Sequence, residues 1–101
     1  ANSQRSIATS MSCEDIAHDF TYYKGLESVC DYQAPFVSVA FKKLGDSQEC
    51  QIKLGRRFEE ISSQTMEVMR RDVQARGLGV VCREKAGEYS EMQSTVKASI
   101  I

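Results

Sequence analysis

Tryptophan is absent from this sequence, and proline and histidine occur once each. No run of apolar residues approaches the ~18–20 that a helix needs to cross a membrane, so we expect no membrane span. The chain starts with small polar residues, a pattern that is compatible with an exported protein after removal of its signal peptide and is not specific to one. The hydrophobic and charged fractions, 42% and 27%, are those of an ordinary globular protein. We therefore expect one folded domain over residues 12–101, preceded by a flexible arm over residues 1–11.

Neither sign of charge dominates, because 13 basic residues balance 14 acidic ones and the formal net charge is −1. Nucleic-acid binding needs a dominant positive field, so we expect no nucleic-acid partner. The charges are unevenly placed: residues 53–85 carry eight basic and five acidic side chains, whereas residues 1–52 carry four and seven. We interpret the acidic residues near the first helix as its solvated face: Glu14, Asp15, Asp19, Glu27 and Asp31.

The motifs of several common active sites are also missing. There is no serine in a Gly-x-Ser-x-Gly context, no glycine-rich phosphate loop and no His-Glu-x-x-His pair. A zinc site uses ligands paired at short spacing. Cys13 and His18 are the nearest approach to such a pair, and they do not share a helix face. We therefore expect a protein that is not an enzyme and that uses no metal and no cofactor.

The sequence does contain four cysteines, and no two of them lie close together. Wide spacing through a small domain is typical of disulfides in an oxidising compartment, and it excludes a CxxC redox motif. The alternative is a cytosolic helical protein with four buried free thiols. We favour two disulfides and a secreted or periplasmic location. The cysteines are Cys13, Cys30, Cys50 and Cys82.

Apolar residues recur every three or four positions in four segments, which predicts an all-α fold. The first helix is expected to begin after a Ser12 cap and to end at Gly25. The second segment runs from Leu26 to Leu44, with a break at Ala34–Pro35, and is expected to end at Gly45. Residues Phe36 to Phe41 also fit a strand, but we favour a helix because a strand would have no partner elsewhere in the chain.

The third segment is the longest, with an apolar stripe from Cys50 to Val73 that includes Val68. A bend is expected near its start, at Gly55. The fourth segment follows the tight connection Gly77-Leu78-Gly79. Helices joined by short connections pack as antiparallel neighbours, so the four segments predict a small up-down bundle of about four helices.

The up-down arrangement also predicts the disulfide connectivity. Cys13 and Cys50 lie at one end of such a bundle, and Cys30 and Cys82 lie at the other. Any other pairing needs a bridge that runs the length of a helix, roughly 20–30 Å. Bridged Cα atoms lie within ~7 Å of each other. We therefore predict the disulfides Cys13–Cys50 and Cys30–Cys82.

The single histidine lies in the fragment His18-Asp19-Phe20-Thr21-Tyr22. This fragment resembles the His-Asp-Phe-x-Tyr segment of the secreted bacterial and fungal phospholipases A2, which are exported, helical and disulfide-bonded. The resemblance implies a hydrolase in which His18 is the general base and Asp19 helps to hold a calcium ion. That family also has a calcium-binding loop and a cysteine-bearing helix before the histidine, and the 17 residues before His18 contain no such pattern. We favour a surface histidine without a catalytic role.

Two arginine doublets lie two heptads apart in the third segment, so they fall on nearly the same side of that helix. Interleaved acidic residues favour a solvated, salt-bridged flank. If this surface binds an acidic partner, the candidate partner-binding residues are Arg56, Arg57, Arg70, Arg71 and Arg76. The methionines Met66, Met69 and Met92 either fill the core or line a pliable apolar cavity.

These patterns favour a small secreted or periplasmic protein that binds a protein partner without catalysis, as an inhibitor, adaptor, immunity or chaperone-like factor. The first alternative is a carrier of a small apolar ligand or lipid. The second is a hydrolase that uses His18 and Asp19. The sequence leaves the identity of the partner and the oligomeric state open.

Overall fold

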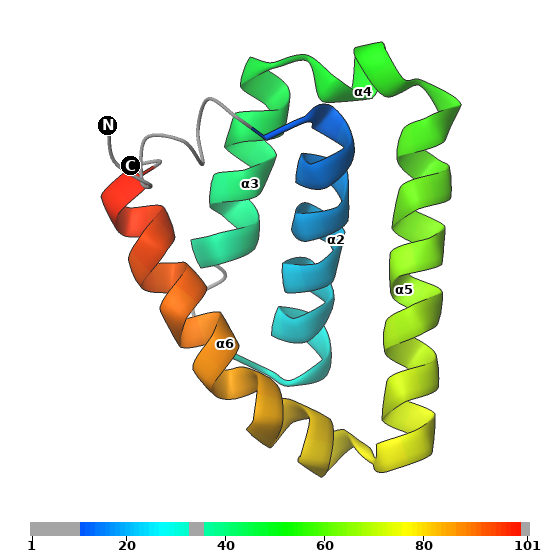
Figure 1. Ribbon diagram of the computed structural model, residues 1–101, viewed down its shortest axis with the longest axis vertical. Coiled ribbons are helices and arrows are strands. Elements are labelled where there is room, and N and C mark those ends of the chain that lie inside the picture. The colour runs from blue at the N-terminus through cyan, green and yellow to red at the C-terminus, as the bar shows by residue number, and fades with distance from the viewer. Residues whose placement is uncertain (1–10, 33–35, 100–101) are drawn as a thin grey trace.

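The computed structural model describes residues 11–32 and 36–99, and every regular element in these two ranges is a helix. The predicted all-α fold is therefore confirmed, with one short helix more than the four expected. Residues 1–10 of the expected arm over residues 1–11, and the expected break at Ala34–Pro35, lie outside the described residues. The helices are α2 (Cys13–Val29), α3 (Phe36–Ser47), α4 (Cys50–Leu54), α5 (Arg56–Arg76) and α6 (Leu78–Ser99) (Figure 1).

Helix α2 lies at the centre of the bundle, between α3 and α5 (Figure 1), and packs most extensively against these two helices. Helices α2 and α5 run in one direction and α3 and α6 run in the other, so the chain alternates up and down as expected. Helix α6 starts at the end of α5 and crosses obliquely towards α3, whereas the short helix α4 joins α3 to α5 at the opposite end. None of the described helices is long and apolar enough to cross a membrane.

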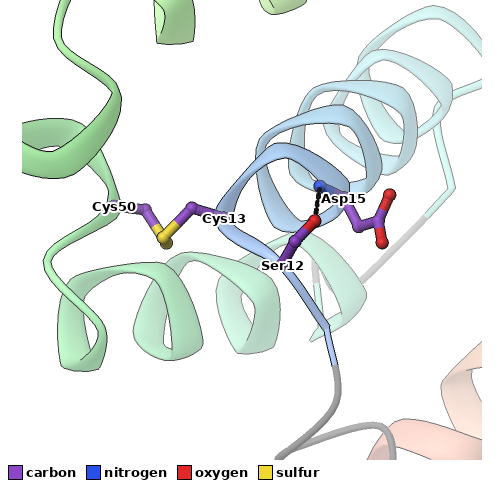
Figure 2. The surroundings of a disulfide bond; sticks show 4 residues. All are labelled: Ser12, Cys13, Asp15 and Cys50. Atoms are coloured by element: carbon purple, nitrogen blue, oxygen red, sulfur yellow. Dashed lines mark hydrogen bonds between the residues drawn. A yellow bond between two sulfur atoms is a disulfide. The ribbon is translucent and has the colours of Figure 1, made fainter.

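The start of α2 is fixed by a helix cap and by a disulfide (Figure 2). The side chain of Ser12 accepts a hydrogen bond from the backbone N–H of Asp15 at 3.1 Å, which confirms the predicted cap. The next residue, Cys13, is bonded to Cys50 at the start of α4, and their Cα atoms are 5.1 Å apart. Helix α4, which has five residues, is thereby anchored to the central helix.

The second disulfide lies at the opposite end of α2. Cys30 directly follows the last residue of α2 and is bonded to Cys82 of α6, with 5.4 Å between their Cα atoms. Both predicted disulfides are therefore confirmed. They close loops with sequence separations of 37 and 52 residues. In the chain-entropy model, a disulfide that closes a loop of this length stabilises the folded state by about 4 kcal/mol.

Two glycines that were expected to end helices lie inside them instead. Helix α2 continues through Gly25 to Val29, and α3 continues through Gly45 to Ser47. A Cβ atom at Gly25 would lie 2.8 Å from Sδ of Met69, so the missing side chain lets α5 approach α2 closely. Gly25 therefore permits close packing of two helices and does not end α2.

Gly55 does more than the expected bend, because it divides the third segment into α4 and α5. Its φ of 56° and the φ of 90° at Gly77 lie in the left-handed region that favours glycine. Gly77 alone separates α5 from α6. Helix α5 is thus bounded at each end by one glycine with a positive φ.

The main core lies where α2, α3 and α6 meet. Its aromatic centre is Tyr23, whose ring centroid is 5.9 Å from that of Phe41 and 6.2 Å from that of Tyr89. Helix α5 contributes Met69 to this cluster, and every other member described comes from α2, α3 or α6. The buried members are Tyr23, Leu26, Val37, Ala40, Phe41, Met69, Tyr89 and Val96.

A buried carboxylate ties the same three helices together. The expectation that Glu27 lies on a solvated face is wrong, because its side chain is buried between α2, α3 and α6. Its carboxylate accepts hydrogen bonds from the backbone N–H of Ser38 at 3.1 Å, from the Ser38 hydroxyl, and from the Tyr89 hydroxyl at 2.7 Å. These three donors replace the water that the carboxylate loses on folding, which is why the burial is tolerated.

Candidate binding grooves beside helix α5

Two grooves run along helix α5. The first, which we call the Met66 groove, has a volume of about 570 Å³ and lies against the end of α2. The second, the Tyr22 groove, has a volume of about 550 Å³ and lies between α2, α5 and α6. The Met66 groove is lined mainly by Val29, Ser62, Met66, Glu67, Arg70 and Val73. The Tyr22 groove is lined mainly by His18, Tyr22, Leu26, Val68, Val81 and Lys85, and Met69 lines both grooves.

The grooves exist because the contact between α2 and α5 is narrow. The buried residues of α5 are Ile61, Thr65 and Met69, which recur every four positions and so form a single stripe. Beside this stripe the hydroxyls of Thr21 and Ser62 are hydrogen-bonded at 2.9 Å. Covering one stripe leaves the two flanks of α5 open, and each flank becomes the wall of a groove.

The Met66 groove has an apolar floor and a charged edge. Val29 and Met66 are 38% and 43% exposed, and Val73 continues the apolar surface along α5. Glu67 and Arg70 stand at the edge. The groove is therefore open to solvent along apolar atoms, an arrangement that a folded domain does not need for its own stability.

One of the predicted partner-binding arginines, Arg70, lines this groove, and a second, Arg71, pairs with the same carboxylate of Glu67. Nε of Arg70 is 3.1 Å and Nε of Arg71 is 3.0 Å from a carboxylate oxygen of Glu67. The hydrogen bond from Arg70, reinforced by the one from Arg71, lowers the pKa of the Glu67 carboxyl. Two guanidinium groups share one carboxylate, so this cluster keeps a net positive charge.

Arg76 has a different environment, at the corner between α5 and α6. Its guanidinium donates to Asp72 at 2.6 and 2.8 Å and to Glu84 at 2.6 and 2.9 Å. These contacts lower the pKa of both carboxyls. Arg76 is thus occupied in joining the two helices, and most of its N–H donors are engaged by Asp72 and Glu84.

The first arginine doublet lies far from the second along α5. Arg57 is 3.3 Å from a carboxylate oxygen of Glu14 on α2, and Arg56 makes no ion pair with any residue that the structure describes. Fourteen residues of helix separate Arg56 from Arg70, which is about 21 Å. The five predicted arginines therefore lie on one helix without forming one cluster.

The Tyr22 groove is enclosed by side chains of three helices. Leu26 and Val81 are buried at its base, and Val68 is 69% exposed at its edge. The ring of Tyr22 forms a wall and is held in place because its hydroxyl donates to Glu88 at 2.9 Å. Burial, followed by this hydrogen bond, raises the pKa of the Tyr22 hydroxyl.

His18 lies at the α2 side of the Tyr22 groove. Its Nδ1 is 2.9 Å from a carboxylate oxygen of Asp19, and its ring stacks on Tyr22 with 6.0 Å between centroids. Burial raises the pKa of the Asp19 carboxyl, and the neighbouring His18 opposes that rise. Among residues 11–32 and 36–99, no three or more His, Cys, Asp or Glu side chains are grouped to hold a metal ion. The side chains described around His18 therefore do not fit the calcium site that the phospholipase resemblance implies.

No motif in the sequence marks the Tyr22 groove. Val68 was expected in a buried stripe and is exposed, because α2 covers only the positions of Ile61, Thr65 and Met69. Lys85 belongs to no sequence motif that would mark it as a binding residue. The available signal was the width of the apolar stripe on α5, which exceeds what one neighbouring helix covers.

No family model, no curated protein and no solved structure matches this chain. Function is therefore inferred from the two grooves and the charges around them.

Proposed function

We propose that this protein is a secreted or periplasmic binding protein that acts without catalysis and engages a protein partner at the Met66 groove. One observation carries the proposal: Val29 and Met66 leave apolar surface exposed in a groove on a disulfide-stapled scaffold. The free energy falls when a partner covers apolar surface that is otherwise in contact with water. The disulfide of Cys30 fixes the Val29 edge to α6, so this surface is preorganised.

The shape of the groove favours a helical or extended segment of a partner. Its α5 wall runs from Ser62 to Gln74, about 18 Å along the helix axis. Ser62 and Ser63 are small and allow close approach, whereas Met66 can adapt its side chain to the partner. An amphipathic helix with apolar residues at i, i+3 or i+4, and i+7 would cover this length.

The charge at the groove edge favours acidic residues on the partner. Arg70 and Arg71 are both exposed and share the single carboxylate of Glu67. Exposed ion pairs of this kind are individually weak, so a partner carboxylate can join or replace them at little cost. Among the five arginines predicted to bind a partner, Arg70 lines the groove, and Arg71 pairs with the same carboxylate, which supports these two as the partner contacts.

A protein of this design acts by occupying a surface of its partner. Inhibitors, adaptors, immunity proteins and chaperone-like factors all work in this way, and the groove does not distinguish among them. The two disulfides are consistent with an oxidising compartment, which supports the secreted or periplasmic location.

Site-specific photo-crosslinking tests the proposal. A photoreactive amino acid replaces Met66 in one version of the disulfide-bonded protein and Ile52 in the other. Ile52 is a matched control because it is apolar and 79% exposed, but lies on α4 away from the Met66 groove. After irradiation in extract of the secreted or periplasmic fraction, we expect a discrete product from position 66 and none from position 52. The additional changes Arg70→Glu and Arg71→Glu should abolish that product. Equal products from both positions, or a product indifferent to the arginine changes, would contradict the proposal.

A further inference from the structure

Lys85 gives the Tyr22 groove a chemistry of its own. Its side chain is 24% exposed, and its Nζ lies 5.8 Å from the centre of the Tyr22 ring and 3.8 Å from the nearest carboxylate oxygen of Glu88. A distance of 3.8 Å is beyond hydrogen-bond reach. The ammonium makes no hydrogen bond to any residue in the described ranges. A partly buried ammonium whose ion pair, with Glu88, is too long for a hydrogen bond favours a ligand that brings a closer acceptor.

The acidic groups beside Lys85 are already engaged. Both carboxylate oxygens of Asp72 accept hydrogen bonds from Arg76, at 2.6 and 2.8 Å. One oxygen of the Glu88 carboxylate accepts the hydroxyl hydrogen of Tyr22, and the other is the oxygen that lies 3.8 Å from Nζ of Lys85. Lys85 is therefore the cation of this groove whose donors are open, and a bound anion would not displace an existing hydrogen bond of the ammonium.

The rest of the groove is mainly apolar, although His18, Gln64, Thr65 and Asp72 also line it. Leu26, Met69 and Val81 form a buried base, and Val68 exposes most of its side chain at the edge. The volume of about 550 Å³ falls within the range of roughly 300–1,000 Å³ that small-molecule sites occupy. One open cation beside an apolar base matches a ligand with one negative charge and a hydrocarbon body.

We infer that the Tyr22 groove binds an apolar monocarboxylate of the class of a medium-chain fatty acid, and that Lys85 donates to its carboxylate. The hydrocarbon chain covers Val68 and contacts Leu26 and Val81. A phosphate monoester would call for more than one cation, and a neutral lipid would leave Lys85 without an acceptor. This site lies on the other flank of α5 from the Met66 groove, so the inference does not rest on the proposed protein partner.

Calorimetric titration of the disulfide-bonded protein with decanoate, below its micellar concentration, tests the inference. We expect saturable one-to-one binding. Lys85→Met keeps the apolar stem and removes the charge, so it should weaken binding by roughly tenfold or more. Lys53→Met is the matched control, because Lys53 is an exposed lysine of α4 outside the groove, and it should leave the affinity unchanged. Decanol should bind the unmodified protein more weakly than decanoate does, and Lys85→Met should remove this difference.

A second pair of variants locates the site. Val68→Glu places a negative charge at the edge of the Tyr22 groove and should abolish decanoate binding, whereas Met66→Glu in the other groove should not change it. Both positions are exposed, so both variants should keep the native circular dichroism spectrum. The inference is overturned if decanoate does not saturate a single site or if decanol binds as well as decanoate. Equal affinity of Lys85→Met, or loss of binding with Met66→Glu and not with Val68→Glu, would also overturn it.

Discussion

The α2–α3–α6 side of the molecule and the α5 side use their apolar residues in different ways. On the first side, aromatic and aliphatic side chains from three helices bury one another around Tyr23. On the second, Met69 is buried while its neighbours Met66 and Val68 remain exposed beside grooves. The difference shows that an apolar stripe contributes to stability only where another helix covers it. The uncovered part of the α5 stripe is available for binding.

The largest expected difference in stability is between two truncations of apolar residues, one on each side of the molecule. Phe41→Ala removes a buried ring that stacks on Tyr23 and should lower the free energy of unfolding by about 3–5 kcal/mol. Val68→Ala removes a mostly exposed side chain, and the change should stay within about 0.5 kcal/mol. Urea denaturation of both variants measures the contrast. Similar losses at the two positions would mean that α5 is as much a part of the core as α3.

A smaller effect is expected at the buried carboxylate of the α2–α3–α6 side. In Glu27→Gln, an amide N–H replaces one acceptor oxygen, so one of the donors from Ser38 and Tyr89 loses its acceptor. The free energy of unfolding should fall by about 1–3 kcal/mol. Glu91→Gln, an exposed position on α6, is the control and should be nearly neutral. An equally neutral Glu27→Gln would show that the carboxylate does not tie the three helices.

The smallest effects are expected at two helical glycines, where substitution by alanine should change the stability in opposite directions. In Gly25→Ala the new methyl group would lie 2.8 Å from Sδ of Met69, so the buried Met69 side chain must move or α5 must shift, and the protein should be destabilised by about 1 kcal/mol. Gly87→Ala adds the same methyl group where nothing lies within 4 Å and should stabilise α6 by about 0.5–1 kcal/mol. Thermal unfolding of the two variants measures both changes in stability. Stabilisation by both substitutions would indicate that the α2–α5 contact is loose.

The fold and both disulfides could be predicted because they depend on local periodicity and on the order of the helices. The Ser12 cap lies three residues from the N–H that it satisfies, and the helical stripes place each cysteine at an end of the bundle. Gly25 was misread as a helix end because sequence does not distinguish a glycine that ends a helix from one that admits a neighbour. Met69, the neighbour in question, is far away in the chain.

The candidate site was predicted only in part, for a related reason. Periodicity indicates which side chains are apolar, but it does not reveal which helix covers them, so Val68 was assigned to the core. Glu27 was assigned to the surface because its donors, Ser38 and Tyr89, come from two other helices. The arginines of α5 were identified by their spacing along the helix. Only the structure separates Arg76, which joins two helices, from Arg70, which lines a groove and shares Glu67 with Arg71.

The placement of the two disulfides at the ends of α2 has a consequence for the grooves. Cys13 links one end of α2 to the segment before α5, and Cys30 links the other end to the segment after it. Helix α2, the two bridges and the chain from Cys50 to Cys82 therefore close a covalent macrocycle, with α2 and α5 as its two long sides. Both grooves lie along this ring, and its circumference is fixed by covalent bonds. A ligand or a partner thus meets walls whose spacing is already limited, and the loss of conformational freedom on binding is correspondingly small.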